Sequence, residues 1–109
     1  MFNAMRTAMG DIFNELLATY FDQSRAYLDE LDDAYNEKNF QTLERVFHSM
    51  GSSSMSMGAQ KLSELARSLE KKSTAEAGLI TLDEINALKE EYLLVEKVLK
   101  GLIARDTIE

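Results

Sequence analysis

The chain has 109 residues, of which 45% are hydrophobic, and it carries a formal net charge of −7 at pH 7. This length and composition predict one domain, residues 1–109, with a hydrophobic core, and the acidic charge argues against binding to nucleic acid or to anionic membranes. There is no cysteine, which excludes disulfides and thiolate metal sites, and no proline, which favours long uninterrupted helices.

The N-terminal third has apolar side chains at steps of three and four residues, which is the pattern of an amphipathic helix. They are Met5, Met9, Ile12, Phe13, Leu16, Leu17, Tyr20, Phe21, Tyr27, Leu28, Leu31 and Tyr35. Gly10 is expected to separate a short N-terminal helix from a long helix over residues 11–36. The first turn is expected at Asn36–Asn39.

The middle of the chain predicts two more helices. The first begins near Asn39 and runs to Met57, and Gly58 is expected to cap or break it. The second has four apolar residues on its buried side and fades over residues 71–78, where lysines suit a helix C-terminus. The four apolar residues are Leu62, Leu65, Ala66 and Leu69.

The strongest start signal lies before the last helix. Thr81 followed by Glu84 is the pattern of a capping box, and Ile80 and Ile85 occupy the positions of a hydrophobic staple. Apolar residues then alternate steps of three and four, at Ile85, Leu88, Tyr92, Val95, Leu99 and Leu102. Short connections place neighbouring helices antiparallel, so the sequence predicts an all-α fold: an antiparallel four-helix bundle with a short extra N-terminal helix.

The only histidine, His48, lies halfway along the second long helix. At about 100° per residue, the apolar residues of this helix fall on one side, and His48 falls nearly opposite them. The apolar side consists of Phe40, Leu43, Val46, Phe47, Met50 and Met57, together with Ser53 and Ser54. His48 is therefore predicted to be exposed to solvent rather than buried in the core.

Small residues follow His48 on its own side of the helix. Gly51 and Ser52 stand one turn later, where a long side chain would lean back over the imidazole. We expect them to leave the imidazole open to a large partner, with Met55 exposed beside it. The predicted surface around His48 consists of Glu44, Arg45, Gly51, Ser52, Met55 and Gly58.

The segment FHSMGSSSMSMGAQKLSELARSLE, residues 47–70, resembles the phosphoacceptor region of histidine-containing phosphotransfer (HPt) domains. The family pattern is roughly His-x-Leu-Lys-Gly-Ser-Ser/Ala-x-x-Leu-Gly-Ala. The matching residues are His48, Met50, Ser53, Ser54, Met57, Gly58 and Ala59. Glu70 falls where the family often has a Glu or Gln that hydrogen-bonds and orients the imidazole.

Two residues depart from the family pattern. Gly51 stands where the family has a lysine, and Ser52 stands where it has the following glycine. The lysine offers positive charge to the phosphoryl group, and its loss removes an attraction of about 1 kcal/mol at an exposed site. We expect weaker phosphorylation rather than none, and we expect Arg45, one turn before His48, to act as a substitute cation.

The resemblance implies a phosphocarrier without its own kinase or ATP site, and not an enzyme. His48 would accept a phosphoryl group from a receiver-domain aspartate and transfer it to another response-regulator receiver. The expected partners are receiver domains of hybrid histidine kinases and response regulators. The sequence has no phosphate-binding glycine loop and no carboxylate cluster around His48, so we expect no cofactor here and Mg²⁺ only in the partner receiver domain.

Other readings stay open at this point. A non-phosphorylated helical module that binds a receiver or kinase domain stoichiometrically is the main alternative, and Gly51 in place of lysine favours it. A second alternative is an unrelated acidic helical adaptor in which His48 is incidental. The absence of a long apolar run and of a signal-peptide pattern predicts a cytoplasmic protein, expected as a monomer. Met1 and the extent of the resemblance favour a protein that stands alone over a piece of a hybrid kinase.

Overall fold

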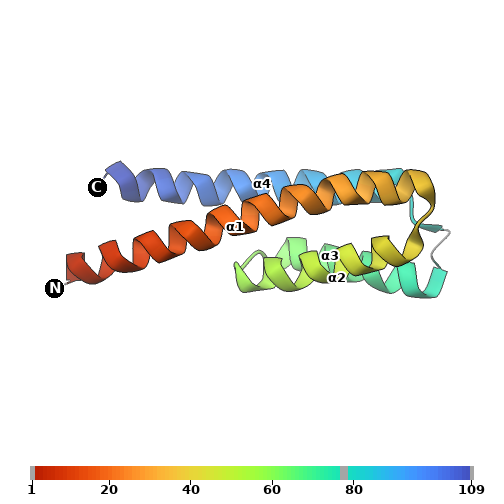
Figure 1. Cartoon of the computed structure of the whole chain (residues 1–109), viewed down its shortest axis with the longest axis horizontal. Coiled ribbons are helices and arrows are strands. Elements are labelled where there is room, and N and C mark those ends of the chain that lie inside the picture. Colours follow the sequence, from red (N-terminus) through yellow and green to blue (C-terminus); the bar gives the residue numbers. More distant parts are fainter. Residues whose placement is uncertain (1, 77–78, 109) are drawn as a thin grey trace.

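The computed structural model describes the backbone of residues 2–76 and 79–108, and the side chains of residue 12, residues 14–75 and residues 79–101. Its four helices are α1 (Phe2–Glu37), α2 (Phe40–Ser56), α3 (Gln60–Glu76) and α4 (Leu82–Ile108). In Figure 1, α1 and α4 run side by side along the molecule, and the shorter α2–α3 hairpin packs against one half of them. The predicted all-α helical bundle is confirmed.

A separate N-terminal helix is not formed. Helix α1 continues through Gly10 and has 36 residues from Phe2 to Glu37. A single glycine inside a helix costs about 1 kcal/mol relative to alanine, which is too little to end a helix when no proline accompanies it. The predicted break at Gly10 is therefore wrong. The side chains of Met5, Met9, Phe13 and Leu102 lie outside the described part of the chain.

The α2–α3 hairpin is too short to cover all of α1. At a rise of 1.5 Å per residue, the 17 residues of α2 span about 26 Å, whereas the 36 residues of α1 span about 54 Å. Near its tip, the hairpin contacts α1 through a hydrogen bond between Ser54 and Tyr20. Ile12 and Leu16 lie beyond that contact and are 61% and 52% exposed, so the apolar side of α1 extends past the part that the hairpin covers.

One hydrophobic core holds the four helices together. Its buried residues are Leu17, Tyr20, Phe21, Leu31, Ala34, Leu43, Val46, Phe47, Met50, Leu62, Ala66, Leu69, Ile80, Ile85, Leu88 and Tyr92. Most of them were predicted from the three-and-four spacing. Phe40, which was predicted on the core side, is more than one-third exposed because it is the first residue of α2.

The turn between α2 and α3 is a Schellman motif, which satisfies the last carbonyls of a helix. The Ala59 N–H donates to the carbonyl of Ser54 at 2.8 Å, and the Gly58 N–H donates to the carbonyl of Met55 at 3.0 Å. Gly58 has a φ of 76°, in the left-handed region that glycine adopts without a steric cost. The prediction that Gly58 caps this helix is confirmed.

The turn between α1 and α2 is a second Schellman motif, but it has no glycine. The Asn39 N–H donates to the carbonyl of Ala34 at 2.8 Å, and the Lys38 N–H donates to that of Tyr35 at 3.2 Å. Lys38 has a φ of 57° and therefore bears the strain of a left-handed conformation. The Asn39 side chain then caps α2 by accepting a hydrogen bond from the Thr42 N–H at 3.2 Å.

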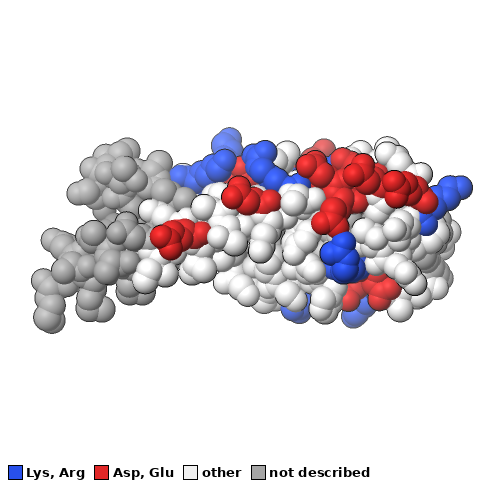
Figure 2. Space-filling model, viewed as in Figure 1, with Lys and Arg blue, Asp and Glu red and all other residues white. Residues whose placement is uncertain are grey.

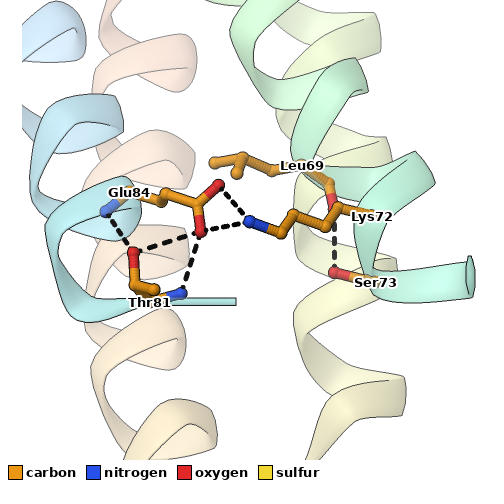
Figure 3. Close-up of polar contacts among 5 residues, drawn as sticks. All are labelled: Leu69, Lys72, Ser73, Thr81 and Glu84. Atoms are coloured by element: carbon orange, nitrogen blue, oxygen red, sulfur yellow. Dashed lines mark hydrogen bonds and ion pairs between the residues drawn. The ribbon is translucent and has the colours of Figure 1, made fainter. Parts of the chain in front are cut away.

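The predicted capping box at the start of α4 is confirmed. The Thr81 N–H donates to Glu84 Oε1 at 3.0 Å, and the Glu84 N–H donates to Thr81 Oγ1 at 3.2 Å (Figure 3). Ile80 and Ile85, the predicted staple, are both buried. Lys72 of α3 adds bonds of 2.8 and 3.0 Å to the two Glu84 oxygens and lowers the pKa of that carboxyl group. This ion pair fixes the end of α3 against the start of α4.

Helix α4 also buries a carboxylate, Glu96, against α1. Its Oε1 accepts hydrogen bonds from Arg25 at 2.6 Å and from Lys100 at 2.7 Å. Burial by itself raises the pKa of Glu96, but the hydrogen bonds from these two cations outweigh burial and lower the pKa to about 2. The ionised form of Glu96 therefore stabilises the α1–α4 contact.

We expect Lys38→Gly to raise the free energy of unfolding by about 0.5–1 kcal/mol, because glycine removes the strain of the left-handed conformation. Urea denaturation followed by circular dichroism measures the change. Asn36→Gly, two residues earlier and within α1, is the matched control and is expected to destabilise the chain. Equal destabilisation by both variants would contradict the role given to Lys38.

We expect Glu96→Gln to lower the free energy of unfolding by about 1–3 kcal/mol at neutral pH, because the charged hydrogen-bond acceptor is lost. A lowered pKa gives stability that is present above the unfolded value of about 4.3 and is lost as the pH falls towards the folded value. The difference between wild type and variant should therefore shrink between about pH 4 and pH 2. Glu90→Gln, at an exposed site of the same helix, should show no such pH dependence.

Candidate functional site

Small buried residues let α2 pack closely against its neighbours. The Ser63 hydroxyl of α3 donates to the carbonyl of Gly51 in α2 at 2.7 Å. The Ser54 hydroxyl of α2 shares a hydrogen bond with the Tyr20 hydroxyl of α1 at 2.9 Å. Gly51, Ser54 and Ser63 are all buried, so these polar contacts lie inside the bundle. They fix the position of α2 relative to α3 and α1.

His48 lies on this fixed helix with its side chain 67% exposed, which confirms the predicted exposure. Its Nδ1 is 2.8 Å from Oε2 of Glu70 on α3. An ionised carboxylate can only accept a hydrogen bond, so Nδ1 is the donor in this contact, and in the neutral imidazole Nε2 then keeps its lone pair. The site is thus an exposed imidazole whose ring is held from one side.

An open groove between α2 and α3 contains the imidazole. It is lined by His48, Ser52, Arg67, Glu70, Lys71, Thr74 and Ala75. Arg67 and Lys71 form no ion pair with any carboxylate in the described part of the chain. The groove therefore presents two cations beside His48, although the whole chain has a net charge of −7.

Acidic side chains gather elsewhere. Figure 2 shows them over the second half of α1, where the sequence has Asp29, Glu30, Asp32, Asp33 and Glu37. Two of these carboxylates form ion pairs with neighbouring helices, Glu30 with Arg45 and Asp32 with Lys89. This acidic cluster on α1 does not line the groove, where Glu70 is the carboxylate among the lining residues.

Gly51 does not belong to the exposed surface around His48, contrary to the prediction. It is buried, and a Cβ atom there would stand 3.1 Å from Cγ of Arg67 and 3.7 Å from the carbonyl oxygen of Ser63. The prediction assumed that the flank of α2 between its apolar side and His48 faces solvent. Helix α3 covers that flank, so the small size of Gly51 serves helix packing.

The other predicted surface residues are divided. Ser52 lines the groove, and Met55 is exposed as predicted. Arg45 forms its ion pair with Glu30 of α1 and does not line the groove, so this geometry does not support Arg45 as the substitute cation. Glu44 is half-buried and Gly58 lies in the α2–α3 turn, and neither lines the groove.

Sequence reasoning missed Arg67 and Lys71. Arg67 precedes Glu70 by three residues, and residues three apart share a face of a helix. This spacing therefore predicts that Arg67 lies on the same face of the helix as Glu70. The sequence indicates Lys71 only as a lysine near a helix C-terminus, because helix periodicity does not show which face of α3 meets α2.

The described part of the chain has no cluster of three or more His, Cys, Asp or Glu residues suited to a metal ion. None of its helices, over the residues described, is long and apolar enough to cross a membrane.

Comparison with models of protein families matches the Hpt domain to residues 15–98. Comparisons with curated proteins and with solved structures found no match. The matched segment covers more than half of the chain and includes α2, α3, His48 and Glu70. By this match, and in agreement with its helical bundle, the chain belongs to the Hpt domain family, whose role is phosphotransfer in two-component signalling.

Proposed function

We propose that the chain is a phosphocarrier whose His48 accepts a phosphoryl group from the aspartyl phosphate of one receiver domain and transfers it to the aspartate of another. The observation that carries this proposal is the contact between His48 Nδ1 and Glu70 Oε2 at 2.8 Å, on a side chain that is 67% exposed. A receiver domain can reach Nε2 from solvent while Glu70 holds the ring.

The transfer follows from the state of the two ring nitrogens. The Nε2 lone pair forms a bond to phosphorus, and the bond from phosphorus to the receiver aspartate breaks, so that aspartate leaves as a carboxylate with the electron pair. The ring keeps its proton on Nδ1 and gains positive charge, which faces the Glu70 carboxylate. Transfer to a second receiver is the same step in reverse.

Positioning dominates this chemistry because the transition state of phosphoryl transfer is loose and in line. The chain contributes a fixed nucleophile, and its sequence has no phosphate-binding glycine loop. The receiver domain is expected to contribute the acidic pocket and its Mg²⁺. The chain is therefore a carrier between receiver domains of hybrid histidine kinases and response regulators, and catalysis requires its partner.

The test is the intact mass of the chain after treatment with purified phosphorylated receiver domains, with His48→Gln as the matched variant. We expect wild type to gain one phosphoryl group that is lost in acid and kept in base, and we expect His48→Gln to gain none. Acid-stable phosphorylation, or equal phosphorylation of both proteins, would contradict the proposal.

The same experiment addresses the alternative function. If wild type gains no phosphoryl group from any receiver but binds a receiver tightly, and His48→Gln binds equally well, the chain is a stoichiometric interaction module. Isothermal titration calorimetry of both proteins with an unphosphorylated receiver domain measures this binding.

A further inference from the structure

We propose that Arg67 of α3 binds the phosphoryl oxygens on His48 and replaces the lysine that the Hpt family pattern has at the position of Gly51. This inference rests on the proposed function, because the phosphoryl group on His48 is the ligand. It assigns to α3 a charge that the family pattern places on α2.

The first support is the contact between Arg67 and Gly51. The Cγ and Nε atoms of Arg67 lie 3.1 and 3.7 Å from the place where a Cβ on Gly51 would stand. The arginine side chain therefore lies against α2 at the point where the side chain of the lysine would begin. A side chain on residue 51 and the present position of Arg67 compete for the same space.

The second support is the register of the two antiparallel helices. His48 on α2 meets Glu70 on α3, and Gly51, one turn later on α2, meets Arg67, one turn earlier on α3. The two pairs are neighbouring levels of one helix–helix contact, about 5 Å apart along the axis. Arg67 and His48 consequently line the same groove.

The third support is charge. Arg67 has no ion-pair partner among the described residues, whereas Arg45, which precedes His48 by three residues, is paired with Glu30. A guanidinium group presents several N–H donors in a planar fork that matches the oxygens of a phosphoryl group. Arg67 is thus the arginine of the groove that is available for an anion.

The experiment uses the full chain phosphorylated by a receiver domain, and it has two readouts. The first is the rate of phosphoryl transfer to His48. The second is the pKa of the phosphoryl group, followed by ³¹P NMR, which reports a nearby cation and does not depend on docking. A guanidinium group beside the phosphoryl oxygens favours their dianionic form and so lowers this pKa.

We expect Arg67→Ala to slow transfer about five- to tenfold and to raise the phosphoryl pKa by about 0.5–1. Arg67→Lys should keep most of both properties because it keeps the charge. Lys97→Ala removes the same charge from an exposed site on α4 and is the control, expected to match wild type in both readouts.

The decisive variant is the double substitution Gly51→Lys with Arg67→Ala. Truncation of Arg67 frees the space beside Gly51, whose φ is not in the left-handed region, so lysine fits there without backbone strain. We expect the double variant to recover the transfer rate and the low phosphoryl pKa. Thermal unfolding of each variant confirms that the bundle is intact.

The outcomes separate this inference from the proposed function. If wild type accepts no phosphoryl group on His48, both fail. If wild type is phosphorylated and Arg67→Ala behaves like Lys97→Ala, only the role of Arg67 fails. Slower transfer with an unchanged phosphoryl pKa, or a double variant that does not recover, would also overturn phosphate binding by Arg67.

Discussion

The close approach of α2 to α3 is the constraint on which the site depends. The Ser63 hydroxyl bonds to the Gly51 carbonyl at 2.7 Å, and the absence of a side chain on Gly51 leaves room for the stem of Arg67. At this separation the Glu70 carboxylate reaches the ring of His48 from the neighbouring helix. A bulkier residue at position 51 would meet the stem of Arg67 at 3.1 Å and displace that side chain. Gly51, which departs from the family lysine, thus leaves the space that Arg67 occupies at the edge of the groove.

The rest of the fold keeps this helix pair rigid and leaves one side of it open. The Schellman turns at Lys38 and Gly58 fix both ends of α2, and the capping box with Lys72 ties the end of α3 to α4. The long helices α1 and α4 support the hairpin from one side (Figure 1). His48 is therefore accessible on a helix held at both ends, with its ring hydrogen-bonded to Glu70, which suits a step in which positioning dominates.

The four-helix architecture was predictable because helix periodicity, the Thr81–Glu84 capping box and Gly58 are local signals. The exposure of His48 was also predictable, because the apolar residues of α2 mark its buried side and His48 lies nearly opposite them. The burial of Gly51 and the groove positions of Arg67 and Lys71 were not, because they depend on which flank of α2 is covered by α3. Gly10 alone suggests a break in α1, but its cost of about 1 kcal/mol relative to alanine is too small to end the helix.

The most direct test of the account is the identification of the ring nitrogens of His48 by long-range ¹H–¹⁵N and ¹⁵N–³¹P NMR. The account predicts a proton on Nδ1 before transfer and phosphorus on Nε2 after it. Glu70→Ala should lose the preference for a proton on Nδ1, whereas Glu70→Gln, which keeps a hydrogen-bond acceptor, should retain it. Phosphorus on Nδ1, or a ring whose proton position is the same in wild type and Glu70→Ala, would contradict the account.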